Sequence, residues 1–263
     1  MQVKDKREIG HILFFERMKN LIRTTYTAIG VVLSAIATVP ALLTMKRKKK
    51  TYTKELFDKE VYKTSSVFGK RMFKFSGSTI EVKGLENIPD GAVLFASNHQ
   101  SNFDIAVLLG YLQKPIGFIS KIEVKKVPIA REWIYYMNGV FLDRSDRRKS
   151  VKTIQEGIQK LKDGHSIVIF PEGTRSKSNQ VGEFKSGALR LGAKALVPIV
   201  PVAIEGTYNI LEANGNRIKP AHVVLEVLPP IYPEQYEQVQ LSEISEQIKE
   251  NIQKTIDKNT KLY

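Results

Sequence analysis

Short apolar segments that alternate with longer, more polar stretches run from residue 78 to residue 228 of this 263-residue chain. The apolar segments cover residues 78–83, 92–97, 116–120, 166–170, 197–204 and 222–228. Helix-like patterns lie among them, at residues 102–112, 129–137, 147–162 and 186–194. Strands of this length separated by helices are typical of βαβ units. The sequence therefore predicts an α/β fold with a mixed, largely parallel sheet flanked by helices.

The outer parts of the chain extend this pattern at both ends. A polar, helix-like stretch covers residues 51–75, and an amphipathic helix is predicted over residues 241–258. The length fits one sizeable domain with attachments. We therefore expect an α/β domain over residues 51–263 and a separate helical arm over residues 1–50. The chain has no cysteine, which excludes disulfides, cysteine nucleophiles and thiolate metal sites.

The arm contains a stretch without charged residues, Thr24 to Met45, which is long enough to span a bilayer as a helix. Basic residues precede it, and five more follow at positions 46–50, where a secretory signal would carry a small-residue cleavage site. Because both flanks are basic, the positive-inside rule draws both toward the cytoplasm. Two arrangements stay open: a span with residues 46–50 inside, or a non-spanning helical hairpin with residues 9–22. A buried core helix of a soluble protein is the less favoured alternative.

The formal net charge is +14, and residues 1–54 hold 12 basic and 3 acidic groups. Nucleic acid is the usual partner of a basic protein. The chain has no zinc-finger or RNA-recognition signature, and basic groups beside an apolar run favour anionic lipid head groups instead. We therefore expect membrane lipids and no nucleic acid as partners. The expected location is the cell membrane, with the α/β domain on its cytoplasmic face.

The first motif with chemical content is the segment 98–104, NHQSNFD, directly after a predicted buried strand. Ligand and catalytic groups gather at the C-terminal ends of strands in α/β sheets. Ser101 and Asp104 have the S-x-x-D spacing of a capping box, so Asp104 could serve only as a helix cap. Alternatively, Asp104 accepts a hydrogen bond from one nitrogen of His99 and fixes its tautomer, which leaves the other nitrogen to remove a proton from a hydroxyl. No G-x-S-x-G nucleophile motif is present, which favours direct transfer over an acyl-enzyme.

A second motif, FPEGTRS at residues 170–176, also follows a predicted buried strand. Its glycine lets backbone N–H groups face a ligand, and Arg175 offers a planar charged fork suited to phosphate. An ordinary turn with a solvated arginine is the alternative. A third segment, residues 139–144, ends in Arg144. By itself it is also consistent with a short strand that ends in a surface charge. The segment 197–202, VPIVPV, carries two prolines three residues apart, which predicts an edge strand or a bulged strand near the site.

Taken together, these segments resemble the lysophospholipid/glycerolipid acyltransferase family. Its blocks NHxSxxD, FxDR, FPEGTRS and VPxxPV occur here in that order, and residues 184–188 match its F-K-x-G-A pattern. The resemblance covers roughly residues 80–230 and is strongest for bacterial members that acylate 1-acyl-glycerol 3-phosphate. One departure lies in the second block, where the family's usual glycine is replaced by Asn138.

The resemblance implies transfer of a fatty acyl group to the sn-2 hydroxyl of lysophosphatidic acid, giving phosphatidic acid. The donor it implies is a thioester of acyl carrier protein or coenzyme A, with no cofactor and no metal. It assigns His99 as general base and Asp104 as its partner. The substrate-binding residues it implies are Arg144 and Arg175 for the acceptor phosphate, Glu172, Gly173 and Thr174 for the shape of the site, and Lys121 as an oxyanion donor. A related acyltransferase with another acceptor (glycerol 3-phosphate, a lysophospholipid or an amino lipid) and a non-catalytic lipid-binding protein remain alternatives.

Overall fold

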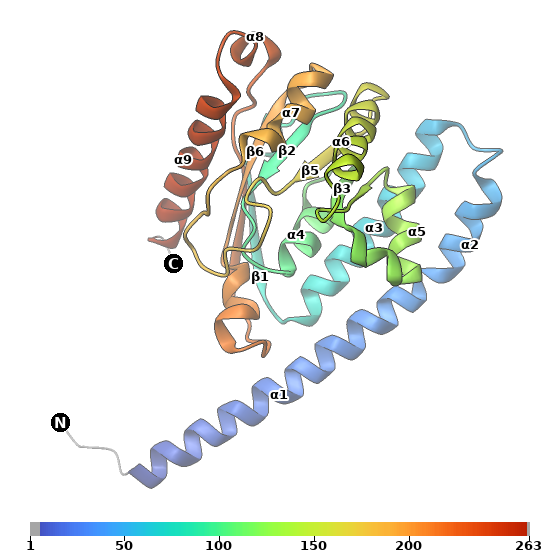
Figure 1. The fold of residues 1–263 in the computed structure, drawn as a ribbon. Coiled ribbons are helices and arrows are strands. Elements are labelled where there is room, and N and C mark those ends of the chain that lie inside the picture. The colour runs from blue at the N-terminus through green and yellow to red at the C-terminus, as the bar shows by residue number, and fades with distance from the viewer. Residues whose placement is uncertain (1–5, 262–263) are drawn as a thin grey trace.

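A seven-stranded sheet lies between two layers of helices in the computed structural model, which describes the backbone of residues 6–261 and the side chains of residues 15–261 (Figure 1). The strand order is β1-β7-β6-β2-β5-β3-β4. All neighbouring pairs are parallel except β6 and β7. The strands are β1 (Thr79–Lys83), β2 (Leu94–Ser97), β3 (Ile116–Lys121), β4 (Val140–Leu142), β5 (Ser166–Ile169), β6 (Ile199–Glu205) and β7 (His222–Val227). The predicted mixed, largely parallel α/β sheet is confirmed.

The helices divide between the two faces of the sheet. The principal helices are α1 (Lys6–Ala37), α2 (Val39–Lys48), α3 (Lys54–Phe75), α4 (Phe103–Tyr111), α5 (Pro128–Tyr136), α6 (Arg147–Lys162), α7 (Ser186–Ala195) and α9 (Leu241–Thr260). Helices α3 and α4 cover one face of the sheet, and α6, α7 and α9 cover the other. The shorter helical segments are η1 (Leu85–Asn87), η2 (Ile122–Lys126), η3 (Thr207–Ile210), η4 (Glu212–Asn214) and α8 (Pro233–Tyr236).

Burial on both faces explains why the strands read as unbroken apolar runs. In β2, Phe95 lies in the core beneath α3 and α4, whereas Leu94 and Ala96 lie in the core beneath α6, α7 and α9. Successive side chains of a strand point to opposite faces, so a strand covered on both sides needs apolar residues at every position.

Strand β6 corrects one expectation from the sequence. It is not an edge strand, because it lies between β2 and β7. Its pairing with β7 is nevertheless irregular. Ile199 pairs with Ile231 and Val202 pairs with Val227. Between these two pairs, the two residues Val200 and Pro201 face the three residues 228–230. Ile199 N donates to Ile231 O, so the nitrogen of Pro201, two residues later, faces the same side. The extra residue lies in the partner segment opposite Pro201, so the bulge is in the neighbour of β6 and not in β6 itself, and it accommodates the missing N–H of Pro201.

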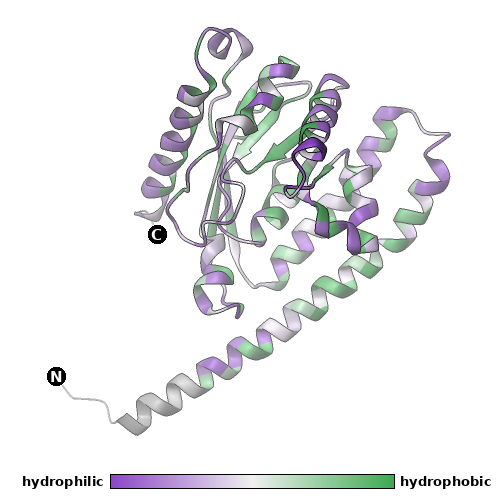
Figure 2. Ribbon diagram, in the orientation of Figure 1, coloured by the Kyte–Doolittle hydropathy of each residue, from purple (hydrophilic) through white to green (hydrophobic). Residues whose placement is uncertain are grey.

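The N-terminal arm corrects a second expectation, because residues 9–22 continue the single helix α1 and do not form a separate hairpin arm. Helix α1 packs on α3 where Gly30 faces Phe75; a Cβ at Gly30 would lie 2.7 Å from that ring. Beside this contact α1 exposes large apolar side chains, including Ile22 (66%), Leu33 (59%) and Ile29 (54%), and Figure 2 shows this apolar stretch. The region Phe15–Lys48 is long and apolar enough to cross a membrane.

Asn138 retains the backbone geometry expected of the glycine that it replaces. Its φ is +59°, in the left-handed region that favours glycine and tolerates asparagine. Its side-chain amide contacts Asp58 (3.3 Å) and His165 (3.0 Å). The departure in the second block therefore preserves the turn between α5 and β4.

Candidate active site

Four neighbouring parallel strands, β2, β5, β3 and β4, deliver the predicted site residues from their C-terminal ends. His99 follows β2, the segment 170–176 follows β5, Lys121 ends β3, and Arg144 follows β4. The loop after β2 is fixed to β6 by Asn98, whose amide accepts from Ile204 N (2.8 Å) and donates to Ile204 O (2.9 Å). These residues lie up to 76 positions apart in the sequence, and the sheet brings them together at the C-terminal ends of its strands.

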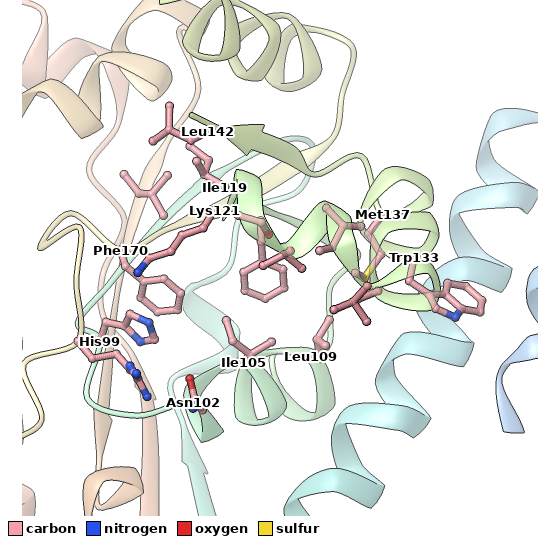
Figure 3. A pocket seen from close by; sticks show the side chains of 18 of the residues that line it. His99, Asn102, Ile105, Leu109, Ile119, Lys121, Trp133, Met137, Leu142 and Phe170 are labelled. Atoms are coloured by element: carbon pink, nitrogen blue, oxygen red, sulfur yellow. The ribbon is translucent and has the colours of Figure 1, made fainter. Parts of the chain in front are cut away.

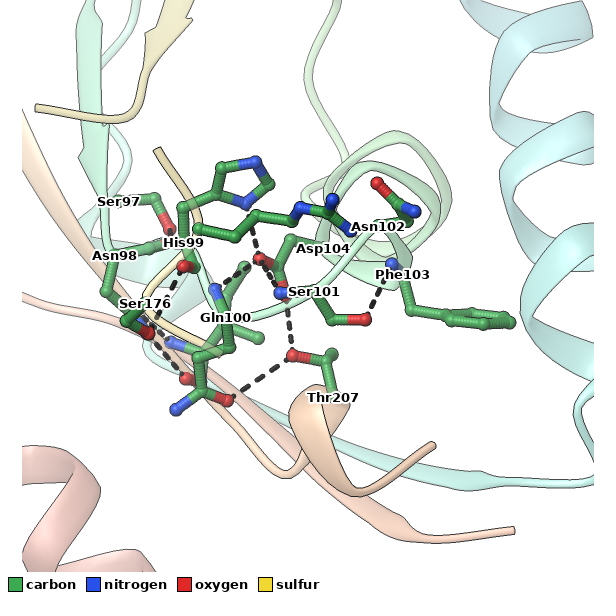
Figure 4. A network of polar contacts seen from close by, with 12 residues as sticks. Ser97, Asn98, His99, Gln100, Ser101, Asn102, Phe103, Asp104, Ser176 and Thr207 are labelled. Atoms are coloured by element: carbon green, nitrogen blue, oxygen red, sulfur yellow. Dashed lines mark hydrogen bonds and ion pairs between the residues drawn. The ribbon is translucent and has the colours of Figure 1, made fainter. Parts of the chain in front are cut away.

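The buried carboxylate of Asp104 organises the histidine loop (Figure 4). Its Oδ2 lies 2.7 Å from His99 Nδ1 and accepts from the backbone N–H groups of Gln100 (2.7 Å) and Ser101 (2.9 Å). Its Oδ1 accepts from the hydroxyl of Thr207 at 2.5 Å. These donors compensate a fully buried charge. The bond to Ser101 N is half of a capping box, so Asp104 both caps α4 and orients the histidine.

His99 is held in a defined orientation with one ring nitrogen free for chemistry. Its ring stacks on Phe170, with centroids 3.9 Å apart and planes tilted by 16°. Its carbonyl accepts from Ser176 N (2.8 Å), which joins the two strand-end loops. With a proton on Nδ1 shared toward Asp104, Nε2 carries a lone pair at the wall of the cavity that the ring lines. This is the arrangement of a general base.

Glu172 lies behind the cavity wall, not among the residues that line it. Its Oε1 accepts from His99 N (2.7 Å) and its Oε2 accepts from Gly182 N (3.0 Å). Burial raises the pKa of the Glu172 carboxyl, while these two N–H groups oppose that rise. The geometry makes Glu172 a support for the backbone of the histidine loop and of the segment that follows residue 176.

Cationic ends converge around Gly173, which has φ +73° and lines the cavity with Thr174. Arg144 donates to the Gly173 carbonyl. A Cβ at Gly173 would lie 3.5 Å from Lys185 Nζ and 3.7 Å from Arg144 Nη1, so both cations border this turn. The sequence reasoning did not single out Lys185 as a site residue, although it noted the F-K-x-G-A pattern that contains it.

Arg175 also lines the cavity, and its guanidinium is fixed by an acid that sequence reasoning missed. Arg175 Nη1 donates to Glu212 Oε1 at 2.8 Å, and the Glu212 side chain is 3% exposed. The same oxygen accepts from Asn102 N (3.1 Å), beside the histidine loop. Glu212 lies in the polar sequence LEANGN, which is typical of a solvated turn, so no sequence signal marked it.

One cavity of about 1160 Å³ connects these groups to an apolar tunnel (Figure 3). Figure 3 shows Lys121 extending toward His99 and Phe170 at one end of the cavity. Ile105, Leu109 and Met137 line the apolar part, which reaches Trp133 and the arm helix α1. Trp133 Nε1 donates to Thr38 Oγ1 at 2.8 Å and so ties α5 to the arm. The cavity combines a base, several cations and an apolar extension.

Comparison with known proteins places this site in a family. A family model described as Acyltransferase matches residues 79–205. A probable 1-acyl-sn-glycerol-3-phosphate acyltransferase from Mycoplasma pneumoniae is 32% identical over 78% of this chain and 79% of its own length. The 1-acyl-sn-glycerol-3-phosphate acyltransferase of Escherichia coli is 33% identical over 59% of this chain and 63% of its own length.

A solved structure agrees with these sequence relatives. The crystal structure of the 1-acyl-sn-glycerophosphate acyltransferase PlsC from Thermotoga maritima superimposes with a TM-score of 0.82 at 32% identity, covering 93% of this chain and 97% of that one. A chloroplast relative from Arabidopsis thaliana, 42% identical, is matched over only 39% of its own length. The chain therefore belongs to the acyltransferase family that the sequence blocks indicated, and it is an enzyme of the acyltransferase class.

Proposed function

We propose that the protein transfers a fatty acyl group from a thioester to the sn-2 hydroxyl of 1-acyl-glycerol 3-phosphate, giving phosphatidic acid. The observation that carries this proposal is the 2.7 Å contact between His99 Nδ1 and Asp104 Oδ2, in a cavity that also holds cations and an apolar tunnel. The base suits a hydroxyl, the cations suit a phosphate, and the tunnel suits a hydrocarbon chain. The names of the relatives support the same acceptor.

The reaction follows from the free nitrogen of the histidine. Nε2 of His99 takes the proton of the acceptor hydroxyl, and the hydroxyl oxygen attacks the carbonyl carbon of the thioester. The new C–O bond gives a tetrahedral oxyanion, and the C–S bond then breaks. The leaving thiolate takes the proton back from Nε2, so the enzyme returns to its starting state. Asp104 stabilises the transient imidazolium, as the buried carboxylate of a hydrolase triad does.

The charged residues divide between oxyanion and phosphate. Lys121 extends toward His99 and is the side-chain candidate for the oxyanion, alongside backbone N–H groups. Arg175 and Arg144, with Gly173 and Thr174 between them in the cavity wall, would hold the acceptor phosphate. Glu172 contributes through the loop that it holds, by binding the His99 N–H.

The arm would place this site at a membrane. Its exposed apolar side chains would enter the hydrocarbon region, while basic residues 46–50 contact anionic head groups. Because these cations prefer the cytoplasmic side, we place the α/β domain on the cytoplasmic face. The packing of α1 on α3 and its contribution to the cavity would bring lipid and active site together.

Substitution of the base tests the chemistry. His99→Ala should abolish transfer at unchanged folding, because its role lies in the transition state. The chain offers a matched control at the other edge of the sheet: His165 Nδ1 lies 3.1 Å from Asp58 Oδ2 and does not line the main cavity. His165→Ala should keep most of the activity. Full turnover by a folded His99→Ala protein would refute the assigned base.

A panel of acceptors tests the substrate. The purified enzyme should acylate radiolabelled lysophosphatidic acid more efficiently than glycerol 3-phosphate, which has no hydrocarbon chain for the apolar tunnel. It should also prefer lysophosphatidic acid to lysophosphatidylcholine or an amino lipid, which offer the arginines no phosphate monoester dianion. Equal rates with an uncharged acceptor would contradict the phosphate assignment. No transfer to any acceptor with any thioester would contradict the whole proposal.

A further inference from the structure

Two exposed parts of the cavity wall, which we take as its entrances, differ in chemistry. At one, the α1 side chains Val32 (57% exposed) and Ile36 (52% exposed) both line the cavity and face the surroundings. This entrance is apolar and belongs to the arm that carries the exposed apolar side chains. A lipid acceptor held at a membrane surface can reach the cavity there without crossing water.

The second entrance is basic and lies at the start of α7. Lys177, Lys185 and Gly187 line the cavity and are exposed, and a Cβ at Gly187 would meet nothing within 4 Å. The adjoining wall is formed by Ser150 and Ile154 of α6. Helices α6 and α7 cover the sheet face opposite α3, the helix that packs on the arm (Figure 1). This entrance therefore opens away from the apolar surface of α1.

The exposed surface of α6 and α7 also carries positive charge. Arg147, Arg148 and Lys152 on α6 and Arg190 on α7 are exposed, and none lines the cavity. They form no ion pair with any residue in the described part of the chain, whereas neighbouring Lys149 lies 3.5 Å from both Asp143 and Asp146. We call these four unpaired residues the basic rim.

The position of two rim residues carries an energetic cost. Arg147 and Arg148 occupy the first turn of α6, which has no acidic residue of its own. The partial positive charge of a helix N-terminus disfavours cations there. Asp146, at the N-cap, accepts from the backbone N–H groups of Arg148 and Lys149 and offsets part of that charge. An anionic partner bound at the rim would explain why arginines occupy these positions.

We infer that the basic rim docks an acidic carrier protein, whose phosphopantetheine thioester enters by way of Lys177 and Lys185 and delivers the acyl group to His99. This inference rests on the proposed function and specifies its donor. The rim residues lie outside the cavity and on two helices, which suits a partner broad enough to contact both α6 and α7. A protein seated on α6 and α7 would contact both the rim and the entrance. Lipid and carrier would then reach His99 from opposite sides.

Charge reversal at the rim tests the docking surface. Arg148→Glu/Arg190→Glu should lower kcat/KM for a carrier-bound acyl donor at least tenfold, leave the acceptor KM unchanged, and flatten the salt dependence of the rate. Glutamate at position 148 is favourable at a helix N-terminus, so electrostatics should not lower the Tm of the rim variant. The matched control is Lys162→Glu/Lys194→Glu, on the last turns of the same helices; residues 148 and 162 are roughly 21 Å apart along α6.

Assays with two acyl donors, acyl-coenzyme A and the acyl-carrier protein, show which one uses the rim. Acyl-coenzyme A should be unaffected by the rim reversal, whereas Lys185→Ala should weaken use of both donors, because it acts at the shared entrance. The inference is overturned if the control reversal lowers carrier use as much as the rim reversal does. Equal loss with acyl-coenzyme A, or a wild-type enzyme that uses acyl-coenzyme A but not the carrier-bound donor, overturns it as well.

A binding measurement keeps the inference distinct from the proposed function. Titration of the inactive His99→Ala protein with acyl-carrier protein should show saturable binding that the rim reversal weakens at least tenfold. Binding that the rim reversal leaves unchanged refutes the docking surface. Retained rim-dependent binding without transfer by the wild-type protein would instead refute the proposed reaction.

Discussion

Glu212 joins the arginine of one strand-end loop to the histidine loop of another. Its Oε1 accepts from Arg175 Nη1 and from Asn102 N, and the side chain is almost fully buried. Glu212→Ala removes the acceptor for both groups, so Arg175 loses its fixed orientation. A hydrogen bond to a charged group contributes about 1.5–3 kcal/mol. We expect the acceptor KM to rise about tenfold to a hundredfold in a steady-state assay.

The conservative variant separates positioning from charge. The amide oxygen of Glu212→Gln still accepts from Arg175 and Asn102, so this protein should recover most of the acceptor affinity. If the glutamine protein is as defective as the alanine protein, the role of Glu212 is electrostatic and the positioning account is wrong. Circular dichroism of both proteins controls for folding.

The contrast between His99 and Glu212 shows which site residues a sequence can reveal. His99 and Asp104 lie five positions apart after an apolar run, so their contact is local and the spacing predicts it. Glu212 lies 110 positions from Asn102 and Thr207 lies 103 positions from Asp104. Nothing near Glu212 or Thr207 in the chain indicates these partners. Their roles exist only once β6 has placed the segment after it beside the histidine loop.

The elements themselves were largely predictable, because the inner strands β2, β5 and β6 are buried on both faces and most helices have a polar side. Two of the alternatives that the sequence left open, an edge strand and a hairpin arm, are excluded, each for a physical reason. The prolines of β6 suggested an edge, but a bulge opposite Pro201 removes the need for its missing N–H within an inner strand. The hairpin predicted for the arm assumed a break before residue 24, whereas the break lies at Thr38, two residues before Pro40. Charge alone does not end a helix; proline does.

The pH dependence of stability tests the burial of Tyr236, which joins α8 to the residues that follow α7. The Tyr236 hydroxyl donates to Val197 O at 3.0 Å, and burial raises the pKa of Tyr236 to about 12 from its ordinary 10.0. In the unfolded chain this tyrosine ionises first, so stability falls as pH rises from 10 to 12. Tyr236→Phe should cost about 1 kcal/mol at pH 8 and less at pH 11, by urea denaturation. An equal cost at both pH values would contradict this linkage.

Helix α5 sets the depth of the apolar tunnel. Met137, directly after α5, lines the cavity beside Trp133. Met137→Trp should shorten the tunnel and Met137→Ala should lengthen it. Each methylene that loses or gains burial changes the free energy by about 0.8 kcal/mol, roughly fourfold in rate per carbon. Competition among acyl donors of different chain length measures this, and an unchanged preference in both variants would show that the chain lies elsewhere.

At the scale of the whole molecule, the cavity joins segments that are far apart in the chain. Its wall includes Val32 of the arm, His99 after β2 and Leu191 of α7. Sequence patterns identify each segment but not the enclosed volume, because the volume depends on how three layers and the arm pack together. For the same reason the arm serves two roles that its sequence did not separate. Some of the exposed apolar side chains of α1 line the cavity and others do not.

Substitutions of exposed α1 residues that lie outside the cavity separate these two roles. Ile29 and Leu33 do not line the cavity, unlike Val32 and Ile36. Burial of a large apolar side chain in a bilayer is worth about 1.5–3 kcal/mol, so Ile29→Ser/Leu33→Ser should weaken binding to anionic vesicles by roughly a hundredfold or more. We expect activity on vesicle-bound lysophosphatidic acid to fall, while activity on a short-chain, soluble acceptor stays near that of the wild type.

The control for this experiment lies on the far side of the molecule. Leu196, after α7, is 60% exposed, and Leu196→Ser removes similar apolar area without touching the arm. It should leave both activities unchanged. Deletion of residues 1–50 is a poorer test, because it removes part of the cavity wall and would impair both acceptors. If Ile29→Ser/Leu33→Ser reduced use of the soluble acceptor as much as use of the vesicle-bound one, α1 would act on the cavity and not by holding the enzyme at a membrane.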